Sequence, residues 1–335
     1  MPELISLFCG PGGFDHGFAQ AGFVTRLAYD RDPVAVQTHR RNHRGADALE
    51  ADLSTIEVTE IIDEWHRRSD VAPVGVIGGS PCQSFSVSNV HQKSRDKRHL
   101  LPLHFARVLA GLQAEFNLDF FVFENVPGYA GKKHSRRLQI FKGRLARLGF
   151  RIFEGVMDAQ NFGVPQVRPR VFVVGVNADK YSDAVLPKFV FPIKNRARTR
   201  TVADVLQGLP RPVYFDRRDP KPDIPYHRNH WCMTPHAPRF HDGSLKPGHA
   251  QGRSFRVLSW NKPSYTVAYG NREVHVHPNR MRRLSVFEAM LLQGFPRSYV
   301  LKGTLSDQIH LVSEAVSPPV AKALALSLIA QLNLK

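Results

Sequence analysis

The sequence predicts a doubly wound α/β sheet followed by a smaller, irregular and basic region. Short apolar runs alternate with amphipathic stretches through the first half of the chain. This pattern ends near Asn177, and clear helical spacing returns from about Arg282. Alternation of strands and helices over such a length is typical of an open, mostly parallel sheet with helices on both faces.

The elements can be assigned from the periodicity of apolar residues. Strands are expected at residues 3–8, 25–30, 48–52, 74–80, 119–126, 151–159 and 170–176. Helices are expected at residues 14–22, 33–43, 56–68, 100–116, 135–148, 284–295 and 318–332. Ser285 and Glu288 have the spacing of a capping box, and Pro318 and Pro319 stand where a helix start tolerates proline.

The composition is that of a globular protein. Of 335 residues, 42% are hydrophobic and 22% charged, which excludes a disordered chain. The three cysteines are too few for a disulfide framework and fit a reducing compartment. We see no apolar run near the ~18 residues of a membrane span and no secretory leader, so we expect a cytoplasmic protein without a membrane partner, nucleoid-associated if prokaryotic.

The net charge points to a polyanionic partner. Lys and Arg number 46 against 29 Asp and Glu, a formal charge of +17. Residues 178–280 alone contain 18 basic and 8 acidic side chains. Nucleic acid is the leading candidate for a soluble protein this basic, and the alternative is a solubility surface or contact with an acidic membrane.

A glycine-rich loop follows the first expected strand, in FCGPGGFDHGF (8–18). Gly10, Gly12 and Gly13 allow a sharp turn and close approach of a ligand, ahead of a helix N-terminus. The loop is not the GxGxxG nicotinamide fingerprint, because Asp15 replaces the third glycine. Two acidic residues stand at the ends of strands, where a nucleoside site would need them. Asp30 could bind a ribose and Asp52 an adenine amine. The alternative is that each is a plain strand end or helix cap.

Cys82 follows the strand 74–80 in GGSPCQSFS (78–86). Ligands of open α/β sheets bind outside the carboxyl ends of the strands, and a thiolate there can act as a nucleophile. The alternative is an inert buried cysteine. We favour the nucleophile because Glu124 ends the strand 119–126, which we expect beside the first, and a carboxyl group next to a thiol suits acid–base chemistry.

These segments resemble the DNA (cytosine-5) methyltransferases. FCGPGGFDHGF resembles the cofactor loop of that family, GGSPCQSFS its Pro-Cys segment and ENV (124–126) its acidic motif. QVRPR (166–170) matches its Gln-x-Arg-x-Arg pattern, and RRLSVFEAMLLQGFP (282–296) resembles the segment that organises target recognition. The five motifs occur in the family order over almost the whole chain.

The resemblance implies a Rossmann-like methyltransferase fold in three parts. Residues 1–177 would bind S-adenosylmethionine and carry catalysis, residues 178–280 would recognise the DNA target, and residues 281–335 would form a hinge and a returning C-terminal helix. The product would be S-adenosylhomocysteine, and no metal is expected. The implied cofactor contacts are Phe8, Gly10, Gly12, Gly13, Asp30, Asp52, Leu53, Leu101 and Val316.

The resemblance also implies a covalent mechanism. Cys82 would add to C6 of a flipped cytosine while Glu124 acts at N3 and the exocyclic amine. Arg168 and Arg170 would contact the base carbonyl and a phosphate, Arg170 being favoured at the base, with a strand salt bridge as the alternative. The polar, basic stretch 83–99 would close over the base or be an ordinary surface loop.

Double-stranded DNA is therefore the expected partner, and the protein is expected to act as a monomer on DNA, possibly with a cognate restriction or defence system. Candidate DNA contacts, which the sequence does not rank, are Gln83, Ser86, Ser88, Arg196, Arg198, Arg200, Arg253, Arg256 and Arg272. Two alternative functions stay open. One is an RNA (tRNA) cytosine-5 methyltransferase, and the other is a catalytically silent DNA-binding module.

Three sequence features depart from simple expectations. The family usually opens its first motif with an acidic residue, where this chain has Ser6, and usually has Gly-Asn where this chain has Ser313 and Glu314. Both changes concern the cofactor contacts rather than the reaction type. His227, His230, Cys232 and His236 lie within ten residues, but their spacing fits no standard zinc pattern.

Overall fold

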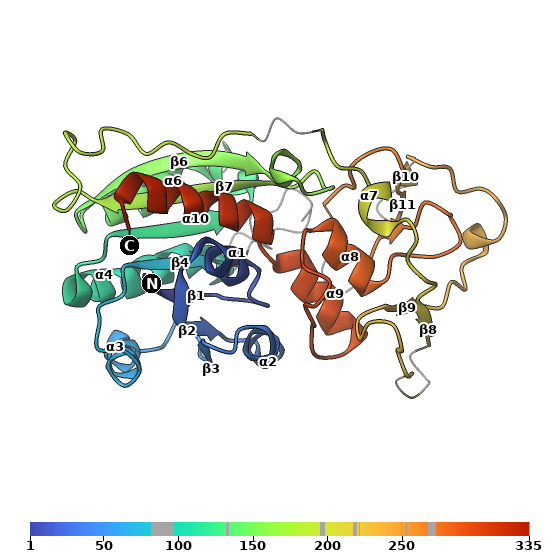
Figure 1. Ribbon diagram of the computed structural model, residues 1–335, viewed down its shortest axis with the longest axis horizontal. Coiled ribbons are helices and arrows are strands. Elements are labelled where there is room, and N and C mark those ends of the chain that lie inside the picture. Colours follow the sequence, from blue (N-terminus) through green and yellow to red (C-terminus); the bar gives the residue numbers. More distant parts are fainter. Residues whose placement is uncertain are drawn as a thin grey trace. The chain divides into compact units, whose positions relative to one another are not determined.

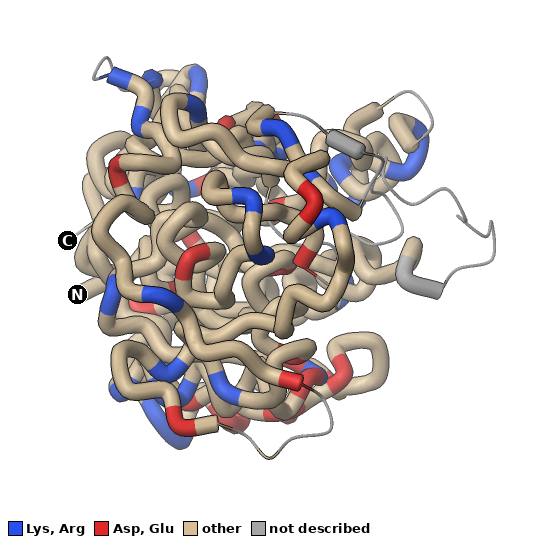
Figure 2. Tube along the Cα trace, turned by 90° about the vertical axis from the view of Figure 1, so that its right-hand side faces the viewer, with Lys and Arg blue, Asp and Glu red and all other residues tan. Residues whose placement is uncertain are grey.

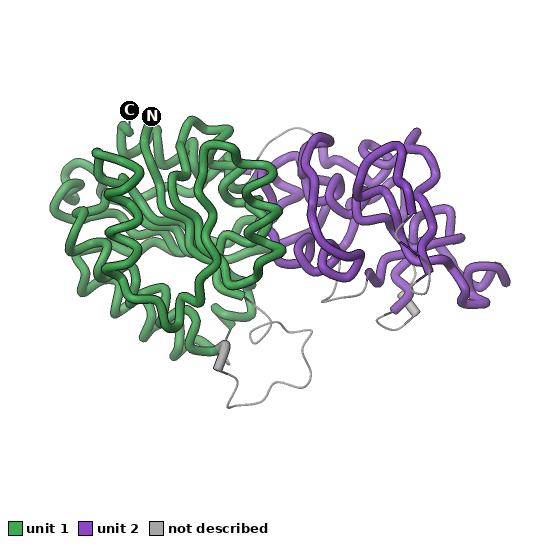
Figure 3. Tube along the Cα trace, turned by 90° about the horizontal axis from the view of Figure 1, so that it is seen from below, with its two compact units in different colours: residues 1–157, 169–193, 320–335 green, residues 158–168, 194–319 purple. Residues whose placement is uncertain are grey.

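The computed structural model of the chain describes residues 1–81, 97–131, 134–194, 198–216, 220, 222–248, 250–251, 254–266 and 273–334. The chain divides into two compact units (Figure 3). Unit 1 comprises Met1–Met157, Pro169–Ile193 and Val320–Lys335, and unit 2 comprises Asp158–Arg168 and Lys194–Pro319.

Unit 1 is built on one seven-stranded sheet (Figure 1). Its strands are β1 (Glu3–Leu7), β2 (Val24–Asp30), β3 (Asp47–Glu50), β4 (Gly75–Gly79), β5 (Phe120–Asn125), β6 (Phe150–Asp158) and β7 (Pro169–Asn177). Their spatial order is β3-β2-β1-β4-β5-β7-β6, and β7 runs antiparallel to β5. Along the sequence, strands β1 to β3 lie successively closer to one edge of the sheet, and the strands from β4 onward lie toward the other edge. The sheet therefore has a switch point between β1 and β4, where α/β proteins bind ligands.

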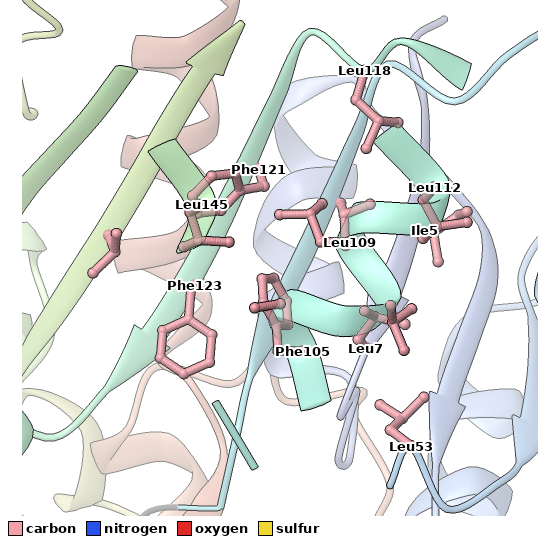
Figure 4. Close-up of a cluster of buried hydrophobic side chains, with 14 of the residues drawn as sticks. Ile5, Leu7, Leu53, Phe105, Leu109, Leu112, Leu118, Phe121, Phe123 and Leu145 are labelled. Carbon is pink, nitrogen blue, oxygen red and sulfur yellow. The ribbon is translucent and has the colours of Figure 1, made fainter. Parts of the chain in front are cut away.

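The helices of unit 1 are α1 (Gly13–Ala21), α2 (Pro33–Asn42), α3 (Val58–His66), α4 (Leu101–Phe116), α5 (Pro127–Ala130) and α6 (Ser135–Ala146), with α10 (Pro318–Leu332) returning to it from unit 2. Short 3₁₀ turns lie at Lys97–Leu100 in unit 1 and at Ala159–Phe162 in unit 2. The main core lies between one sheet face and helices α3, α4 and α6, where Phe105, Phe121 and Phe123 pack together (Figure 4). On the other face, Phe14 of α1 contacts Phe172 of β7.

The periodicity of the sequence predicted these elements well. Every strand and helix expected before Asn177 is present, with ends displaced by at most two residues. Ser285 caps α8 (Val286–Leu292) in a complete capping box with Glu288, as predicted. Helix α9 (Leu305–Glu314) was not predicted, although Thr304 and Asp307 form a second capping box that signals its start.

Unit 2 has little regular structure in its described residues. Besides α8 and α9 it contains α7 (Ala203–Leu206), a 3₁₀ turn at Pro238–Phe240, and the short strands β8 (Val213–Phe215), β9 (Trp231–Met233), β10 (Ala250–Gln251), β11 (Phe255–Val257) and β12 (His275–Val276). These strands form one sheet of three and one of two. A buried ion pair braces the start of α8, since both nitrogens of the Arg282 fork donate to Glu288 at 2.7 and 2.8 Å.

One helical stretch, Leu305–Leu332, passes the length and composition test for a membrane span within the described residues. It comprises α9 and α10 with the residues between them. However, 56% of its most apolar window is buried inside the protein. A buried core helix passes the same test, so the segment is weak evidence for a membrane span.

Candidate active site

The carboxyl ends of β4 and β5 meet at one point of the sheet edge. Gly79 of β4 is paired in register with Glu124 of β5, so these two strands are neighbours, as predicted. The chain leaving β4 continues through Ser80 and Pro81 toward Cys82. Cys82 lies outside the described residues, as do Gln83, Ser86 and Ser88 and most of the expected loop 83–99.

Glu124 is buried and paired with an arginine. Its Oε1 lies 3.0 Å from Nε of Arg170, on the antiparallel strand β7. The Nη1 group of Arg170 also donates to the carbonyl oxygen of Pro169 at 2.8 Å. The two side chains are 9% and 12% exposed, so water screens their attraction little. The sheet thus fixes a carboxylate and a guanidinium together at the edge to which β4 leads.

The ends of β4 and β5 are closely packed beside Glu124. A Cβ atom at Gly79 would lie 2.8 Å from the Glu124 Oε2 atom, so a side chain at this position would displace the carboxylate. A Cβ at Gly78 would lie 2.5 Å from the carbonyl oxygen of Leu7. Buried Asn125 donates to the Ser80 hydroxyl at 3.1 Å and so ties the end of β5 to the chain that leaves β4.

The two described cysteines are unsuited to act as nucleophiles. Cys9 and Cys232 are both buried and free of disulfides. Burial raises the pKa of Cys9 well above its usual value, and the charges of Asp30 and Asp15 raise it further. Burial also raises the pKa of Cys232 to about 12. Both groups are therefore neutral thiols at physiological pH, whereas the reactive form of cysteine is the thiolate.

The glycine-rich loop joins β1 to α1 as the sequence predicted. Gly10 and Gly12 adopt positive φ angles of 53° and 88°, and Gly12 is the N-cap of α1. The Gly10 amide donates to Asp30 Oδ2 at 2.9 Å, and the Asp32 amide donates to Oδ1 at 2.9 Å. Burial raises the pKa of Asp30. A Cβ at Gly10 would meet no atom within 4 Å, so the loop leaves open space beside it.

The other predicted cofactor residues have different surroundings. Asp52 lies two residues beyond β3, is exposed, and accepts the Ser54 amide at 2.8 Å, a local turn that lowers its pKa. Leu53 and Leu101, the first residue of α4, are buried in unit 1, and Phe8 is half-buried with φ of 53°. Val316 is buried in unit 2, between α9 and α10.

Arg168 has a structural environment. It is 2% exposed, and its Nη2 donates to the carbonyl oxygens of Ser313 and Ala315, each at 2.9 Å. These carbonyls lie at the C-terminal end of α9, where a cation interacts favourably with the helix dipole. The guanidinium group of Arg168 thus anchors the end of α9 within unit 2.

The candidate DNA contacts of unit 2 that the structure describes have different partners within the protein. Arg198 forms an exposed ion pair with Asp204 at 2.6 Å. Arg200 donates to the Gly163 carbonyl at 3.3 Å, and Arg256 lies over the Tyr265 ring at 5.6 Å. Arg196, Arg253 and Arg272 lie outside the described residues. Lys and Arg are spread over several segments of the chain rather than gathered on one (Figure 2).

The histidine-rich segment 227–236 is engaged in other contacts. His227 stacks on Phe287 at 4.0 Å, His230 bonds the Ser285 hydroxyl at 2.9 Å, and His236 pairs with Asp216 at 2.6 Å. In the part of the chain that the structure describes, no group of three or more His, Cys, Asp or Glu side chains could hold a metal ion.

The comparisons with known proteins agree with this fold. A model of the C-5 cytosine-specific DNA methylase family matches residues 3–330. The Type II methyltransferase M.MthTI of Methanothermobacter thermautotrophicus is 30% identical, with 96% of each chain covered. The Type II methyltransferase M.FnuDI of Fusobacterium nucleatum is 29% identical, with 96% of this chain and 93% of the relative covered.

A solved structure is similar over its whole length. It is described as a DNA modification methyltransferase encoded within an E. coli prophage, and it has a TM-score of 0.80 and 26% identity, with all of both chains covered. The chain belongs to the C-5 cytosine-specific DNA methylase family, which confirms the resemblance found in its motifs. It is accordingly a DNA cytosine C5-methyltransferase with a Rossmann-like fold.

Proposed function

We propose that the chain transfers a methyl group from S-adenosylmethionine to C5 of a cytosine flipped out of a specific DNA sequence, as the modification enzyme of a restriction or defence system. The observation that carries the proposal is the buried Glu124–Arg170 pair beside the strand that leads to Cys82. The names of the Type II relatives favour the restriction–modification setting.

In this proposal Cys82 is the nucleophile. The two other cysteines are buried neutral thiols, so chemistry at a thiolate falls to Cys82. Its sulfur forms a bond to C6 of the base, and the electron pair of the C5–C6 double bond moves toward C5, which makes C5 nucleophilic. After methylation a base removes the C5 proton, and the thiolate leaves as the double bond re-forms. Covalent attachment replaces one difficult step with easier ones.

Glu124 and Arg170 act on the base during these steps. Glu124 acts at N3 and the exocyclic amine, where it supports proton addition as negative charge develops on the ring. Arg170, fixed against Glu124, directs its remaining donors to the base carbonyl. We assign Arg168 a positioning role, because its guanidinium group is committed to the end of α9 and it precedes Arg170 by two residues.

S-adenosylmethionine would be held along the carboxyl ends of β1, β2 and β3. The open space beside Gly10 admits a ligand close to the backbone, and Asp30 and Asp52 place carboxylates near the ends of β2 and β3. Leu53, Leu101, Phe8 and Val316 are the proposed apolar contacts. The bound cofactor would supply an electrophilic methyl group.

We propose that residues 178–280 recognise the DNA target, that residues 1–177 carry catalysis, and that residues 281–335 form a hinge and a returning helix. Basic side chains would contact phosphates for register, while a few groups read base edges. C6 of cytosine is inaccessible within a duplex, so the base must be flipped out at a cost of a few kcal/mol. We propose that the protein acts as a cytoplasmic monomer on DNA.

A substrate assay tests this function. Purified protein is incubated with methyl-tritiated S-adenosylmethionine and either unmethylated duplex DNA or tRNA. We expect label only in DNA, and bisulfite sequencing of a plasmid from expressing cells should show methylation in one short sequence context. Label only in tRNA would favour the RNA methyltransferase, and DNA binding without label would favour the silent binding module.

A further inference from the structure

Two departures noted in the sequence come together in unit 1. Ser6 lies in β1, where the family usually has an acidic residue, and Asp15 lies in the first turn of α1, where a dinucleotide fingerprint would have glycine. The two residues are 1% and 0% exposed. The Ser6 hydroxyl is one of the groups that lower the pKa of Asp15, so their side chains share one buried site.

The Asp15 carboxylate is stabilised from several sides. Thr25 donates its hydroxyl to Asp15 Oδ1 at 3.1 Å, and Nε2 of buried His39, from α2, lies 3.4 Å from the same oxygen. Burial alone raises the pKa of Asp15, but its interaction with His39 lowers the pKa by more, so the net shift is downward. Asp15 is therefore an anion at neutral pH, in a position that the N-terminal dipole of α1 also favours.

The site is polar but incompletely bonded. Among the described residues, Nδ1 of His39 is buried with no hydrogen-bond partner, and Ser6 Oγ and Asp15 Oδ2 have no partner at full hydrogen-bond geometry. Unbonded buried polar groups are costly, so a cluster of them is retained only where other contacts offset the cost. An acidic residue at position 6 would place a second carboxylate next to that of Asp15, and two carboxylates in such a site cannot both ionise. With Ser6 at this position, the site holds a single carboxylate.

A chain of contacts joins this carboxylate to the glycine-rich loop. The ring of His43 stacks on that of His39 with centroids 4.4 Å apart, and its Nε2 lies 3.1 Å from the carbonyl oxygen of Gly12. Burial lowers the pKa of His43 to about 4, so the ring is neutral at pH 7. A carbonyl oxygen only accepts, so Nε2 carries the proton and donates to Gly12, the left-handed N-cap of α1.

We propose that this chain has moved the buried carboxylate of its first motif from position 6 to position 15, where Asp15, through His39 and His43, fixes the glycine-rich loop for the cofactor. Asp15, His39 and His43 are positioning residues, since none of them is assigned a contact with the reacting atoms. The proposal rests on the proposed use of S-adenosylmethionine at this loop.

A double-mutant cycle tests the exchange directly. The variants are Ser6→Asp, Asp15→Ser and the double variant, with Glu60→Ser, at an exposed acid of α3, as the control. Affinity for S-adenosylhomocysteine is measured by calorimetry without DNA, and stability by urea unfolding without any ligand. Ser6→Asp places a second carboxylate in the buried site, and Asp15→Ser leaves the site without one. Each single change should therefore weaken affinity by about tenfold or more and lower the urea midpoint.

The double variant should recover affinity to within about threefold of wild type, since it restores a single carboxylate to the same site. A double variant no better than its weaker parent would overturn the proposal, as would wild-type affinity in Asp15→Ser. No binding by the wild-type chain would instead contradict the proposed function, and the urea cycle would still show whether positions 6 and 15 exchange the carboxylate.

Substitutions of His43 test the link to the loop if the single variants at positions 6 and 15 fail to fold. Glutamine can present an N–H where His43 has Nε2, whereas alanine cannot. We expect His43→Gln to keep most of the affinity for S-adenosylhomocysteine and His43→Ala to lose about tenfold, with a higher KM for S-adenosylmethionine and a nearly unchanged kcat. Equal affinity in the two variants would exclude the Gly12 contact as a positioning device.

Discussion

The Nε atom of Arg170 lies 3.0 Å from the Oε1 atom of Glu124, with both side chains largely buried at the ends of neighbouring strands. Because β7 is antiparallel to β5, the first part of β7 lies beside the end of β5. The sheet order therefore brings together two residues that are 46 positions apart in the sequence. This pairing keeps the Glu124 carboxylate oriented at the site where we propose that cytosine binds.

Replacing Glu124 by glutamine should lower kcat by about 10²–10⁴-fold. The amide keeps the size of the side chain but cannot support proton addition at N3 in the same way. Affinity for S-adenosylhomocysteine should change little. Steady-state methylation of duplex DNA measures the first effect and calorimetry the second. Glu154→Gln, which removes a surface pair with Lys142, is the matched control. A Glu124→Gln enzyme as fast as this control would refute the assigned role.

Gly79→Ala should impair catalysis without unfolding the protein. The new methyl group would lie 2.8 Å from the Glu124 Oε2 atom and must displace the carboxylate. A misplacement of about 1 Å at a reacting group can cost about 10²-fold in rate. The control is Gly143→Ala in α6, where a Cβ meets nothing within 4 Å and should be neutral or stabilising. Equal kcat values for the two alanine variants would contradict this account.

Glu288→Gln should destabilise unit 2 by about 3–5 kcal/mol, because it leaves the Arg282 charge buried without its partner. Burial raises the pKa of Glu288, but the hydrogen bonds and charge of Arg282 lower the pKa by more, so it lies below its ordinary value of 4.5. The stabilisation is therefore fully present above pH 4.5 and is lost as the pH falls through the lower, folded-state pKa. Urea unfolding from pH 7 downward should show the variant and wild type converging in acid, and a constant gap would contradict the pKa assignment.

DNA binding should depend steeply on salt. If about six phosphates are neutralised, affinity should fall by about 10³-fold between 50 and 200 mM salt. Fluorescence anisotropy with a labelled duplex measures this slope. Removal of a single phosphate-binding arginine should lower the slope by about one unit while leaving sequence preference intact. A salt-independent affinity would show that the charge of +17 serves a purpose other than DNA binding.

Sequence reasoning succeeded where a local pattern determines geometry. The β4–β5 neighbourhood of Gly79 and Glu124 follows from two buried strands in one parallel sheet, and the turns at Gly10 and Gly12 follow from glycine itself. The capping box of Ser285 and Glu288 was visible for the same reason. Each of these features depends on residues whose spacing is fixed by one strand, turn or helix.

Features that depend on contacts between distant elements could not be predicted. Ser6 and Asp15 were each recognised as departures, but only the packing of α1 and α2 on the sheet brings both of them together with His39. Arg168 matched a motif, yet its contacts with α9 involve residues about 145 positions away. Apart from α7, α8 and α9, the described residues of unit 2 form only short strands, turns and side-chain pairs, so periodicity carried little information about that part of the unit.

The most direct test of the central claim is covalent trapping of the enzyme on a duplex that contains 5-fluorocytosine. Fluorine at C5 blocks the final elimination, so the wild-type protein with S-adenosylmethionine should form a denaturation-resistant adduct that mass spectrometry maps to Cys82. Cys82→Ser should give none. An adduct that persists in the serine variant, or methylation of normal DNA by that variant at the wild-type rate, would contradict the account.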